Sequence, residues 1–585
     1  MKYKLYDNAT NNIYERDKVR TFLKNRGIEN VNRYRNLNES DTYDYGLLDN
    51  MYDAVELFDK HFVNRDKIAI LVDEDADGFC SAAIMYLYIK CMDADYPIDY
   101  VMHTKAKAHG LHSNDFELAD DVKLFIIPDA GTNDYKECKK ISEKGIDILI
   151  LDHHEKEDKD NPYALIVNNQ ISDRYPNKEF CGAGIVYKFC RALDVKYWNE
   201  FADDYLDLVA LANISDVMDM RSFETRYYVN QGLLNIKNKA FSAIVDAQEF
   251  STKGIINPHT ISYYITPVIN GCIRFGSQDE KELLFRAFIE QDEYFEYKKK
   301  ATKDKPAEII QESIYDRAAR LSKNAKSRQD KARDKAVKEI IAKVGELSDD
   351  EKVVLVDVTD ITDSSLTGVV AIKISEYYCR PCILVNGTGG SARNFDHSPI
   401  DSIKDVINNT GIFNGQGHAN ACGVLGLKNE EQDNARTTLN EILKDVVYDP
   451  VYLCDYIIQS DDVNVGLIMD LSKTDDLIGH GIDEPMIAVE NIELNKNDIS
   501  IFGKNTDTIS FIVNDVKFIM FRCDEKNGLY NFVQDAWSDD DNITITIVGQ
   551  PSINDYDGTR TPQIIIEDVN VLENNIVGSD EDVAW

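Results

Sequence analysis

The sequence contains few of the features that mark membrane, secreted or disulfide-bonded proteins. No run approaches the roughly 18 uninterrupted apolar residues that a membrane span needs. The N-terminal stretch MKYKLYDNATNNIYERDK also lacks the apolar segment of a signal peptide. We therefore expect a soluble, cytoplasmic protein with no membrane partner. The eleven cysteines are scattered singly through apolar stretches, which favours reduced thiols. Cys379 and Cys382 have the spacing of a metal or redox pair, but no further Cys or His cluster completes a zinc site, so we expect core residues.

Acidic residues clearly outnumber basic ones. The chain has 65 Lys and Arg against 103 Asp and Glu, a net charge of −38. At face value this charge disfavours a nucleic-acid partner, because phosphates attract basic surfaces. Residues 298–343 are the exception, with 15 Lys or Arg and 7 Asp or Glu. Two interpretations stay open: a solvated helix with charge pairs of mixed sign, or a basic helix that lines a nucleic-acid groove.

The length and the hydrophobic pattern predict several domains. A chain of 585 residues is too long for a single core. Residues 67–167 alternate aliphatic runs with amphipathic stretches, which is typical of βαβ units and a parallel sheet. Residues 180–290 indicate helices, and 350–446 indicate a second α/β segment. Short alternating runs from 450 to 574 predict a small β-barrel. We place the domains at 1–60 (helical lead-in), 61–297 (catalytic α/β domain), 298–345 (basic connecting helix), 346–448 (smaller α/β domain), 449–574 (barrel) and 575–585 (acidic tail).

Acidic and histidine side chains follow three of the predicted strands. They are Asp73, Asp75 and Asp77 after KIAILV, Asp129 after LFIIP, and Asp152, His153 and His154 after DILIL. Because the carboxyl ends of parallel strands face one crevice, these groups should converge there, with Asp216 added from a helix. Carboxylates and imidazoles suit Mn²⁺ or Mg²⁺. Two such ions would neutralise the repulsion and activate a water for attack on phosphorus.

Four of these stretches, VDEDADG, PDAG, LDHH and NISDV, resemble in order and spacing the motifs of the DHH phosphoesterase superfamily. The stretches ITPVINGCIRFG, GSARNFD, GQGHANACG and GHGIDEPMIAVENIEL are similar to segments of its RecJ branch. The resemblance extends over most of the chain from about residue 65 to 573. It implies an α/β fold made of a parallel-sheet DHH domain, a long connecting helix, a smaller α/β DHH-associated domain and an oligonucleotide-binding (OB) β-barrel.

The resemblance also implies roles for individual residues. Two divalent cations, Mn²⁺ by preference and Mg²⁺ as the alternative, would be held by Asp75, Asp77, Asp129, His153 and Asp216, with Asp129 between them. Further groups of the catalytic site would be Asp73, Asp152, His154, Arg393 and His418. Substrate would be bound by His109, Asn270, Arg274, Ser391, Gly415 and Gly417. We interpret the glycine-rich runs TGGSARNFD and NGQGHANACG as turns whose N–H groups approach a phosphate.

The implied activity is 5′ to 3′ removal of mononucleotides from single-stranded DNA, in DNA repair, recombination or replication, with RNA as a further candidate substrate. We expect a monomer. Two alternatives stay open: a phosphodiesterase for oligoribonucleotides or cyclic dinucleotides, and a non-catalytic scaffold in a replication complex. In the barrel, Tyr530, Phe532 and Trp537 are candidates for stacking bases. The acidic tail GSDEDVAW is a candidate docking site for a replication or repair protein.

Overall fold

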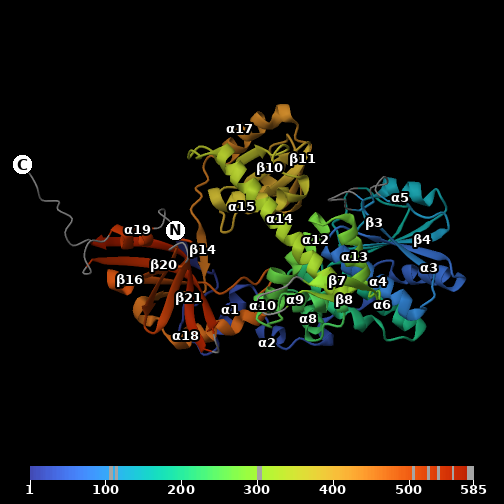
Figure 1. The fold of residues 1–585 in the computed structure, drawn as a ribbon, viewed down its shortest axis with the longest axis horizontal. Helices are drawn as coiled ribbons and strands as arrows, with labels where there is room; N and C mark the ends of the chain where they lie inside the picture. Colours follow the sequence, from blue (N-terminus) through green and yellow to red (C-terminus); the bar gives the residue numbers. More distant parts are fainter. Residues whose placement is uncertain are drawn as a thin grey trace, which may run out of the picture. The chain divides into compact units, whose positions relative to one another are not determined.

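The structure is a computed structural model. It describes residues 1–104, 110–111, 116–157, 159–299, 306–503, 507–523, 528–535, 541–556 and 559–575. The chain forms two compact units (Figure 1). The barrel unit comprises Met1–Asn32, Arg333–Ile478 and Ile482–Trp585, and the parallel-sheet unit comprises Arg33–Ala332 and Gly479–Gly481. The division into six segments drawn from the sequence stays a prediction. Within the described ranges, every helix is too short or too polar to cross a membrane.

The parallel-sheet unit is built on five strands in the order β3-β2-β4-β5-β6, all parallel, so the predicted parallel sheet is confirmed. The strands are rich in Ile, Leu and Val because both faces of the sheet are covered. Side chains of α5 pack with Leu71 and Phe125 on one face, while α4 contacts β2 and α6 contacts β5. The strands are β2 (Lys67–Val72), β3 (Ile98–Met102), β4 (Val122–Pro128), β5 (Asp147–Asp152) and β6 (Leu165–Asn168).

Helices make up most of the rest of this unit, as the sequence predicts for residues 180–290. They are η1 (Glu39–Asp41), η2 (Tyr45–Leu47), α3 (Met51–Asn64), α4 (Ala76–Met92), α5 (Tyr135–Ser142), α6 (Gly182–Tyr197), η3 (Ala202–Tyr205), α7 (Leu206–Ser215), α8 (Phe223–Leu234), α9 (Lys239–Ala247), α10 (Glu249–Thr252), α11 (Pro258–Thr260), η4 (Ile261–Ile265), α12 (Thr266–Phe275) and α13 (Gln278–Phe288). Along the chain, the division between the two units falls within the short helix α2 (Val31–Tyr34), between Asn32 and Arg33.

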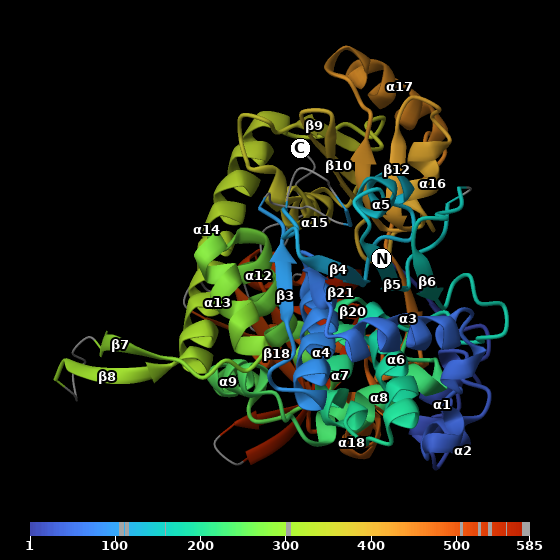
Figure 2. The ribbon, with the colours of Figure 1, turned by 90° about the vertical axis from the view of Figure 1, so that its right-hand side faces the viewer.

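The prediction of a helix from residue 298 onward is wrong for its first part. Strands β7 (Tyr294–Lys299) and β8 (Glu308–Ser313) form an antiparallel ribbon that extends from the rest of the unit (Figure 2). Helix α14 begins only at Ile314 and ends at Val344. In β7 the partly buried Phe295 and Tyr297 alternate with the exposed Tyr294, Glu296 and Lys298, which is the period of a strand. The high lysine content of the segment hid that period.

Several cations of α14 are paired with carboxylates. Arg328 Nη2 lies 2.6 Å from Glu280 Oε2, and Arg320 makes a two-pronged contact with Glu312, with both distances 2.7 Å. Lys326 pairs with Asp330 one turn along the same helix. These pairs favour the interpretation of α14 as a solvated helix with charges of mixed sign.

The barrel unit contains two larger sheets. The first has the order β12-β13-β11-β10-β9 and the second the order β15-β16-β20-β21-β19-β18-β17. The strands are β9 (Val354–Asp357), β10 (Cys382–Asn386), β11 (Gly389–Arg393), β12 (Asn414–His418), β13 (Ala421–Leu425), β14 (Val451–Cys454), β15 (Tyr456–Gln459), β16 (Ile487–Asn495), β17 (Ser500–Phe502), β18 (Thr508–Val513), β19 (Val516–Phe521), β20 (Asn542–Tyr556) and β21 (Thr559–Asn575). The helices are α1 (Lys18–Asn25), η5 (Ser364–Leu366), α15 (Thr367–Tyr378), α16 (Ile403–Asn408), η6 (Asn429–Glu431), α17 (Gln432–Ile442), η7 (Ser460–Asp462), α18 (Val465–Leu471), η8 (Ser472–Leu477), η9 (Lys496–Asp498) and α19 (Gly528–Asp535).

Two details of the barrel unit correct the sequence predictions. The glycines of the two glycine-rich runs lie on strands, because β11 and β12 each pair antiparallel with β13. The turn residues of the two runs are Thr388, Asp396, Ala419 and Asn420. Phe532 is 1 % exposed in the core of the seven-stranded sheet, so it cannot stack a base in this conformation. Tyr530 packs against the same core, and Trp537 lies outside the described residues.

The first 32 residues belong to the barrel unit, whereas the sequence analysis assigned residues 1–60 to a helical lead-in. Strand β1 (Lys2–Leu5) pairs parallel with β14, and the guanidinium of Arg26 is buried against the carboxylate of Asp455. The carbon at the centre of that guanidinium lies 3.9 Å from the centre of the Phe22 ring. The segment is tied by a strand and a buried ion pair, which its polar composition does not indicate.

Two further predictions concern the cysteines and the C-terminal tail. The eleven cysteines are all free thiols, and only Cys91 and Cys379 are exposed, in agreement with the expected absence of disulfides. The tail beyond Asn575 lies outside the described residues, so its proposed docking role stays a prediction.

Candidate metal centre

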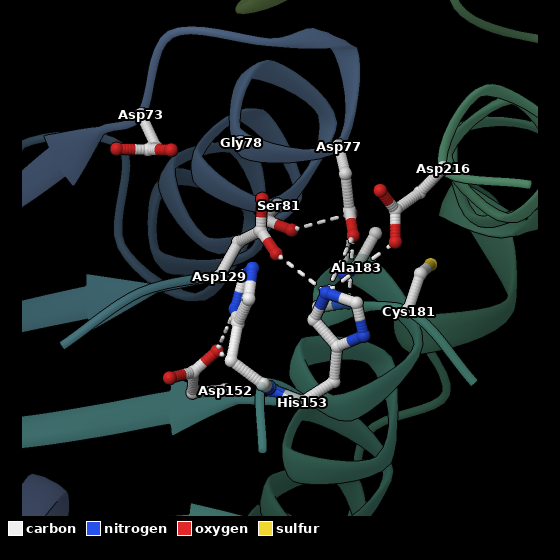
Figure 3. A network of polar contacts seen from close by, with 12 residues as sticks. Asp73, Asp77, Gly78, Ser81, Asp129, Asp152, His153, Cys181, Ala183 and Asp216 are labelled. Atoms are coloured by element: carbon white, nitrogen blue, oxygen red, sulfur yellow. Dashed lines mark hydrogen bonds and ion pairs between the residues drawn. The ribbon is translucent and has the colours of Figure 1, made fainter. Parts of the chain in front are cut away.

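The carboxyl ends of three neighbouring strands bring the predicted acidic and histidine side chains together. Asp73, Asp129 and His153 follow β2, β4 and β5, and these strands are adjacent in the sheet (Figure 3). Their ligand atoms form three overlapping groups, in each of which all atoms lie within 4.8 Å of one another. The groups are Asp77, His153 and Asp216; Asp129, His153 and His154; and Asp73, Asp75 and Asp129.

His153 lies at the centre of the cluster. Its Nε2 atom is 3.2 Å from Asp129 Oδ1, 3.5 Å from Asp216 Oδ2 and 3.8 Å from Asp77 Oδ2. One imidazole nitrogen therefore faces three carboxylates, of which Asp216 comes from the C-terminal cap of α7. A nitrogen donor among carboxylate oxygens is a ligand set that divalent cations such as Mn²⁺ accept.

Asp77 is held by the first turn of α6. The backbone N–H groups of Gly182 and Ala183 donate to its two carboxylate oxygens at 2.7 and 2.8 Å, and Ser81 Oγ donates to it at 3.0 Å. These N–H groups have no partner within their own helix, so the carboxylate satisfies them. Asp77 is thus fixed in place before any ligand binds.

Asp152 orients the two histidines. It is fully buried and accepts from Thr132 Oγ1 at 2.6 Å, from the His153 backbone N–H at 2.7 Å, and lies 2.8 Å from His154 Nδ1. Burial alone would raise the pKa of Asp152, but the neighbouring His154 and the hydrogen bonds hold that pKa below its ordinary value. Asp152 is absent from the three ligand groups, and its contacts fit a role in fixing His154.

Asp129 has the most constrained position. Its backbone adopts φ = 62°, in the left-handed region, and its N–H donates to Leu151 O at 2.8 Å. Its Oδ1 atom is buried and accepts no hydrogen bond within the described part of the chain, although His153 Nε2 is near. A buried carboxylate oxygen that accepts no hydrogen bond fits a site in which a cation binds that oxygen.

The electrostatics of the cluster point the same way. Burial, followed by the charge of Asp77, raises the pKa of both Asp129 and Asp216 well above the ordinary value. Burial and the charge of Asp73 raise the pKa of Asp75, against the opposing effect of Arg274. Without cations these carboxylates repel one another, so the donor set fits divalent metal ions.

Close packing at Gly182 gives a test of this geometry. A Cβ atom on Gly182 would lie 2.5 Å from Asp129 Cβ and Oδ1, so the Gly182→Ala substitution must displace Asp129. We expect Mn²⁺ affinity to fall by about 10- to 100-fold, the loss typical when a ligand's support is removed. Isothermal titration with Mn²⁺ measures the change.

The matched control for that substitution is Gly423→Ala, where the nearest atom would be 3.7 Å away. Unchanged Mn²⁺ affinity in Gly182→Ala would contradict the placement of Asp129 in the metal centre.

Asn270 and Arg274 lie on α12, close to the helix that carries the acidic motif. Asn270 Oδ1 accepts from the Ala76 N–H at 3.2 Å, and Arg274 Nη2 lies 3.9 Å from Asp75 Oδ2. Arg274 is about half exposed, with 47 % of its side chain accessible. Asn270 therefore supports the first turn of α4, and the guanidinium of Arg274 lies near the metal centre.

The other predicted substrate-binding residues lie in the barrel unit. Ser391 is buried on β11, with Oγ 2.8 Å from Thr367 Oγ1, and Arg393 donates to Ala392 O at 2.8 Å. Gly415, Gly417 and His418 lie on β12, where His418 is exposed. His109 is outside the described residues. The roles of all these residues stay predictions.

Some residues that shape the centre escaped the sequence analysis. Gly182 and Ala183 hold Asp77, Thr132 holds Asp152, and His103 is buried beside Asp73. For His103 a signal was present, because it follows the aliphatic run IDYVM just as the acidic residues follow theirs. The support from Gly182 depends on the packing of α6 against α4, which has no local signal.

Comparisons with known proteins agree with this site. The family model for the DHH family, N-terminal domain, matches residues 67–213, and the model for the RecJ OB domain matches residues 454–568. YorK of Bacillus subtilis strain 168, a prophage SPbeta protein whose name gives it as a candidate single-strand-DNA-specific exonuclease, is 34 % identical over 584 residues, which is 98 % of each chain. The single-stranded-DNA-specific exonuclease RecJ of the same organism is 24 % identical over 95 % of this chain and 68 % of its own.

Solved structures share the fold. The crystal structure of RecJ from Thermus thermophilus with Mn²⁺ superposes with a TM-score of 0.68 at 17 % identity, covering 90 % of this chain and 72 % of that one. The structure of the same protein with Mg²⁺ gives a TM-score of 0.63 at 16 % identity, covering 90 % and 71 %. Both neighbours bind a divalent cation of the kind that the acidic cluster fits.

Proposed function

Because the chain belongs to the RecJ family of DHH phosphoesterases, we propose that it is a metal-dependent exonuclease that degrades single-stranded DNA. The observation that carries the proposal is the cluster around His153, where carboxylates that follow β2 and β4 and one from the end of α7 converge on a histidine that follows β5. Such a cluster is too repulsive to serve as a structural core by itself.

We assign the ligands by the groups that the geometry forms. Asp77, His153 and Asp216 would hold one cation, and Asp75 and Asp129, together with Asp73, would hold a second. Asp129 and His153 each belong to two of the three groups, so Asp129 can lie between the ions. Two divalent cations, when bound, lower the pKa of water and neutralise the charge of a phosphodiester.

The chain's own residues then position the substrate. The Arg274 guanidinium can bind a phosphate oxygen beside Asp75, since arginine forms paired hydrogen bonds to phosphate. We propose that Ser391, Arg393, Gly415, Gly417 and His418 bind the DNA backbone, with His418 and Arg393 stabilising the charge that develops at phosphorus. The OB barrel would hold the single strand further from the cut.

Several finer features belong to the proposal. We propose 5′ to 3′ polarity, mononucleotide products, Mn²⁺ as the preferred cation, and a monomeric enzyme of DNA repair, recombination or replication. We propose RNA as a further substrate.

The acidic tail would dock a replication or repair protein. Deletion of the last eight residues should then remove a partner protein from pull-down experiments.

Digestion of labelled DNA tests the proposal. Single-stranded DNA carrying a label at either end, with and without a 5′ phosphate, is incubated with the protein and Mn²⁺, Mg²⁺ or EDTA. We expect Mn²⁺-dependent release of nucleotides from the 5′ end. Resistance of single-stranded DNA together with hydrolysis of dinucleotides would favour the phosphodiesterase alternative. No hydrolysis of either substrate would favour the scaffold.

A further inference from the structure

His103 is a buried histidine outside the predicted ligand set. It follows β3, and the register of the sheet places Met102 opposite Val72, so His103 and Asp73 come side by side as their strands end. His103 and Asp73 are each 1 % exposed. His103 Nε2 lies 3.4 Å from Asp73 Oδ1.

The imidazole of His103 makes no hydrogen bond within the described part of the chain, at either nitrogen. One face of its surroundings is apolar, because the Phe116 ring lies edge-on with centroids 6.0 Å apart. Burying a polar ring without hydrogen bonds costs free energy, and a leucine of similar volume would avoid that cost. The Asp73 carboxylate is the polar group that its Nε2 atom faces.

Asp73 in turn connects His103 to the metal centre. Its carboxylate belongs to the group with Asp75 and Asp129. Its Oδ1 atom also accepts from the Gly110 backbone N–H at 3.0 Å. The Gly110 N–H and the His103 ring therefore face the same oxygen of Asp73.

We propose that His103 is a positioning residue of the metal centre, which donates from Nε2 to Asp73 Oδ1 and thereby fixes the carboxylate for the cation shared with Asp75 and Asp129. The 3.4 Å separation needs only a small ring movement to become a hydrogen bond. His103 is not itself assigned as a ligand, because none of the three groups of ligand atoms contains it. The inference rests on the proposed metal centre.

Three substitutions separate donation from packing. His103→Gln keeps an amide N–H near the position of Nε2. In His103→Asn the side chain is too short to place its amide N–H there, and His103→Leu removes the donor. The control is His61→Gln, since His61 is also buried but lies 2.8 Å from Asp66 Oδ2 and 2.9 Å from Asp147 Oδ2, away from the ligand groups. Mn²⁺ binding is measured from the electron paramagnetic resonance signal of the free ion, and unfolding is followed in EDTA.

We expect His103→Leu and His103→Asn to weaken one of two Mn²⁺ sites by about 10- to 100-fold, whereas His103→Gln stays close to wild type. His61→Gln should lower the unfolding temperature in EDTA and leave both Mn²⁺ affinities unchanged. If His103→Leu does not fold, the Gln and Asn variants decide the question by the same comparison.

The failures of the two proposals differ. A wild-type protein that binds no Mn²⁺ would overturn the metal centre and this inference with it. Normal Mn²⁺ binding by wild type and by His103→Leu or His103→Asn would overturn the role of His103 alone. Equal losses in the Gln, Asn and Leu variants would also overturn it, because they would show that ring shape matters and donation does not.

Discussion

Replacing Asp129 by Asn should lower Mn²⁺-dependent cleavage of single-stranded DNA by about three orders of magnitude, because the substitution removes the carboxylate that we propose to lie between two cations. The same substitution should make the metal-free protein more stable by about 1 kcal/mol, since it removes a buried charge from a repulsive cluster. Nuclease assays with Mn²⁺ and urea unfolding in EDTA measure the two effects.

The stability gain should depend on pH in a definite direction. The folded-state pKa of Asp129 is raised. Below the ordinary carboxyl pKa, Asp129 therefore does not lower the free energy of unfolding of the wild type, and that free energy falls as pH rises through the raised pKa. The advantage of Asp129→Asn should therefore be larger at pH 8 than at pH 5. The opposite trend would show that Asp129 is not held among like charges.

Asp147→Asn is the matched control for Asp129→Asn. Asp147 begins β5, at the other end from His153, and lies near Lys60 and His61. Burial would raise the pKa of Asp147, but hydrogen bonds from Lys60 and His61 hold it below the ordinary value. This substitution should cost stability at neutral pH, a loss that fades on acidification, and leave cleavage intact.

Replacing Asp455 by Asn should destabilise the barrel unit by about 3–5 kcal/mol, because it leaves the guanidinium of Arg26 buried without its partner. The Asp455 carboxylate also accepts from Asn25 Nδ2 at 2.7 Å and from the Met486 N–H at 3.0 Å. Arg26 further donates to Glu484 O at 2.8 Å. Urea unfolding followed by circular dichroism measures the loss.

Two comparisons decide whether the ion pair causes that loss. The double substitution Arg26→Met with Asp455→Leu should recover much of the stability, since no charge stays buried. Asp470→Asn, which removes an exposed pair with Lys473, should change stability by less than about 0.5 kcal/mol. Mn²⁺ affinity should be normal throughout. A small effect of Asp455→Asn would mean that the N-terminal segment is held by other contacts.

The parts of the site that the sequence reveals are those with local patterns. Asp75, Asp129 and His153 each follow an aliphatic run, and parallel strands aim such positions at one crevice. The fold class was accessible for the same reason, since period and element order are read along the chain. Asp216, at the C-terminal end of α7, was expected from a helix, whereas its role as a metal ligand came from the family resemblance.

The parts that escaped depend on tertiary packing or on a misleading composition. The buried contact of Arg26 with Asp455 joins positions that no local pattern connects. Strand β7 was hidden by its lysines, although Tyr294, Phe295 and Tyr297 favour a strand. Ser391 and Arg393 were expected in a turn because glycines precede them, but antiparallel pairing with β13 makes that run a strand.

The pairing of β1 with β14 has a consequence for how the protein is made. Lys2 is synthesised well before its partner Val451, and the segment Arg33–Ala332, which forms nearly all of the parallel-sheet unit, lies between them. That unit can complete its core during translation, whereas the nascent N-terminal arm must wait without its strand partner. If translation pauses before Val451, the parallel-sheet unit should thus be folded while the N-terminal residues 1–32 are open to proteolysis.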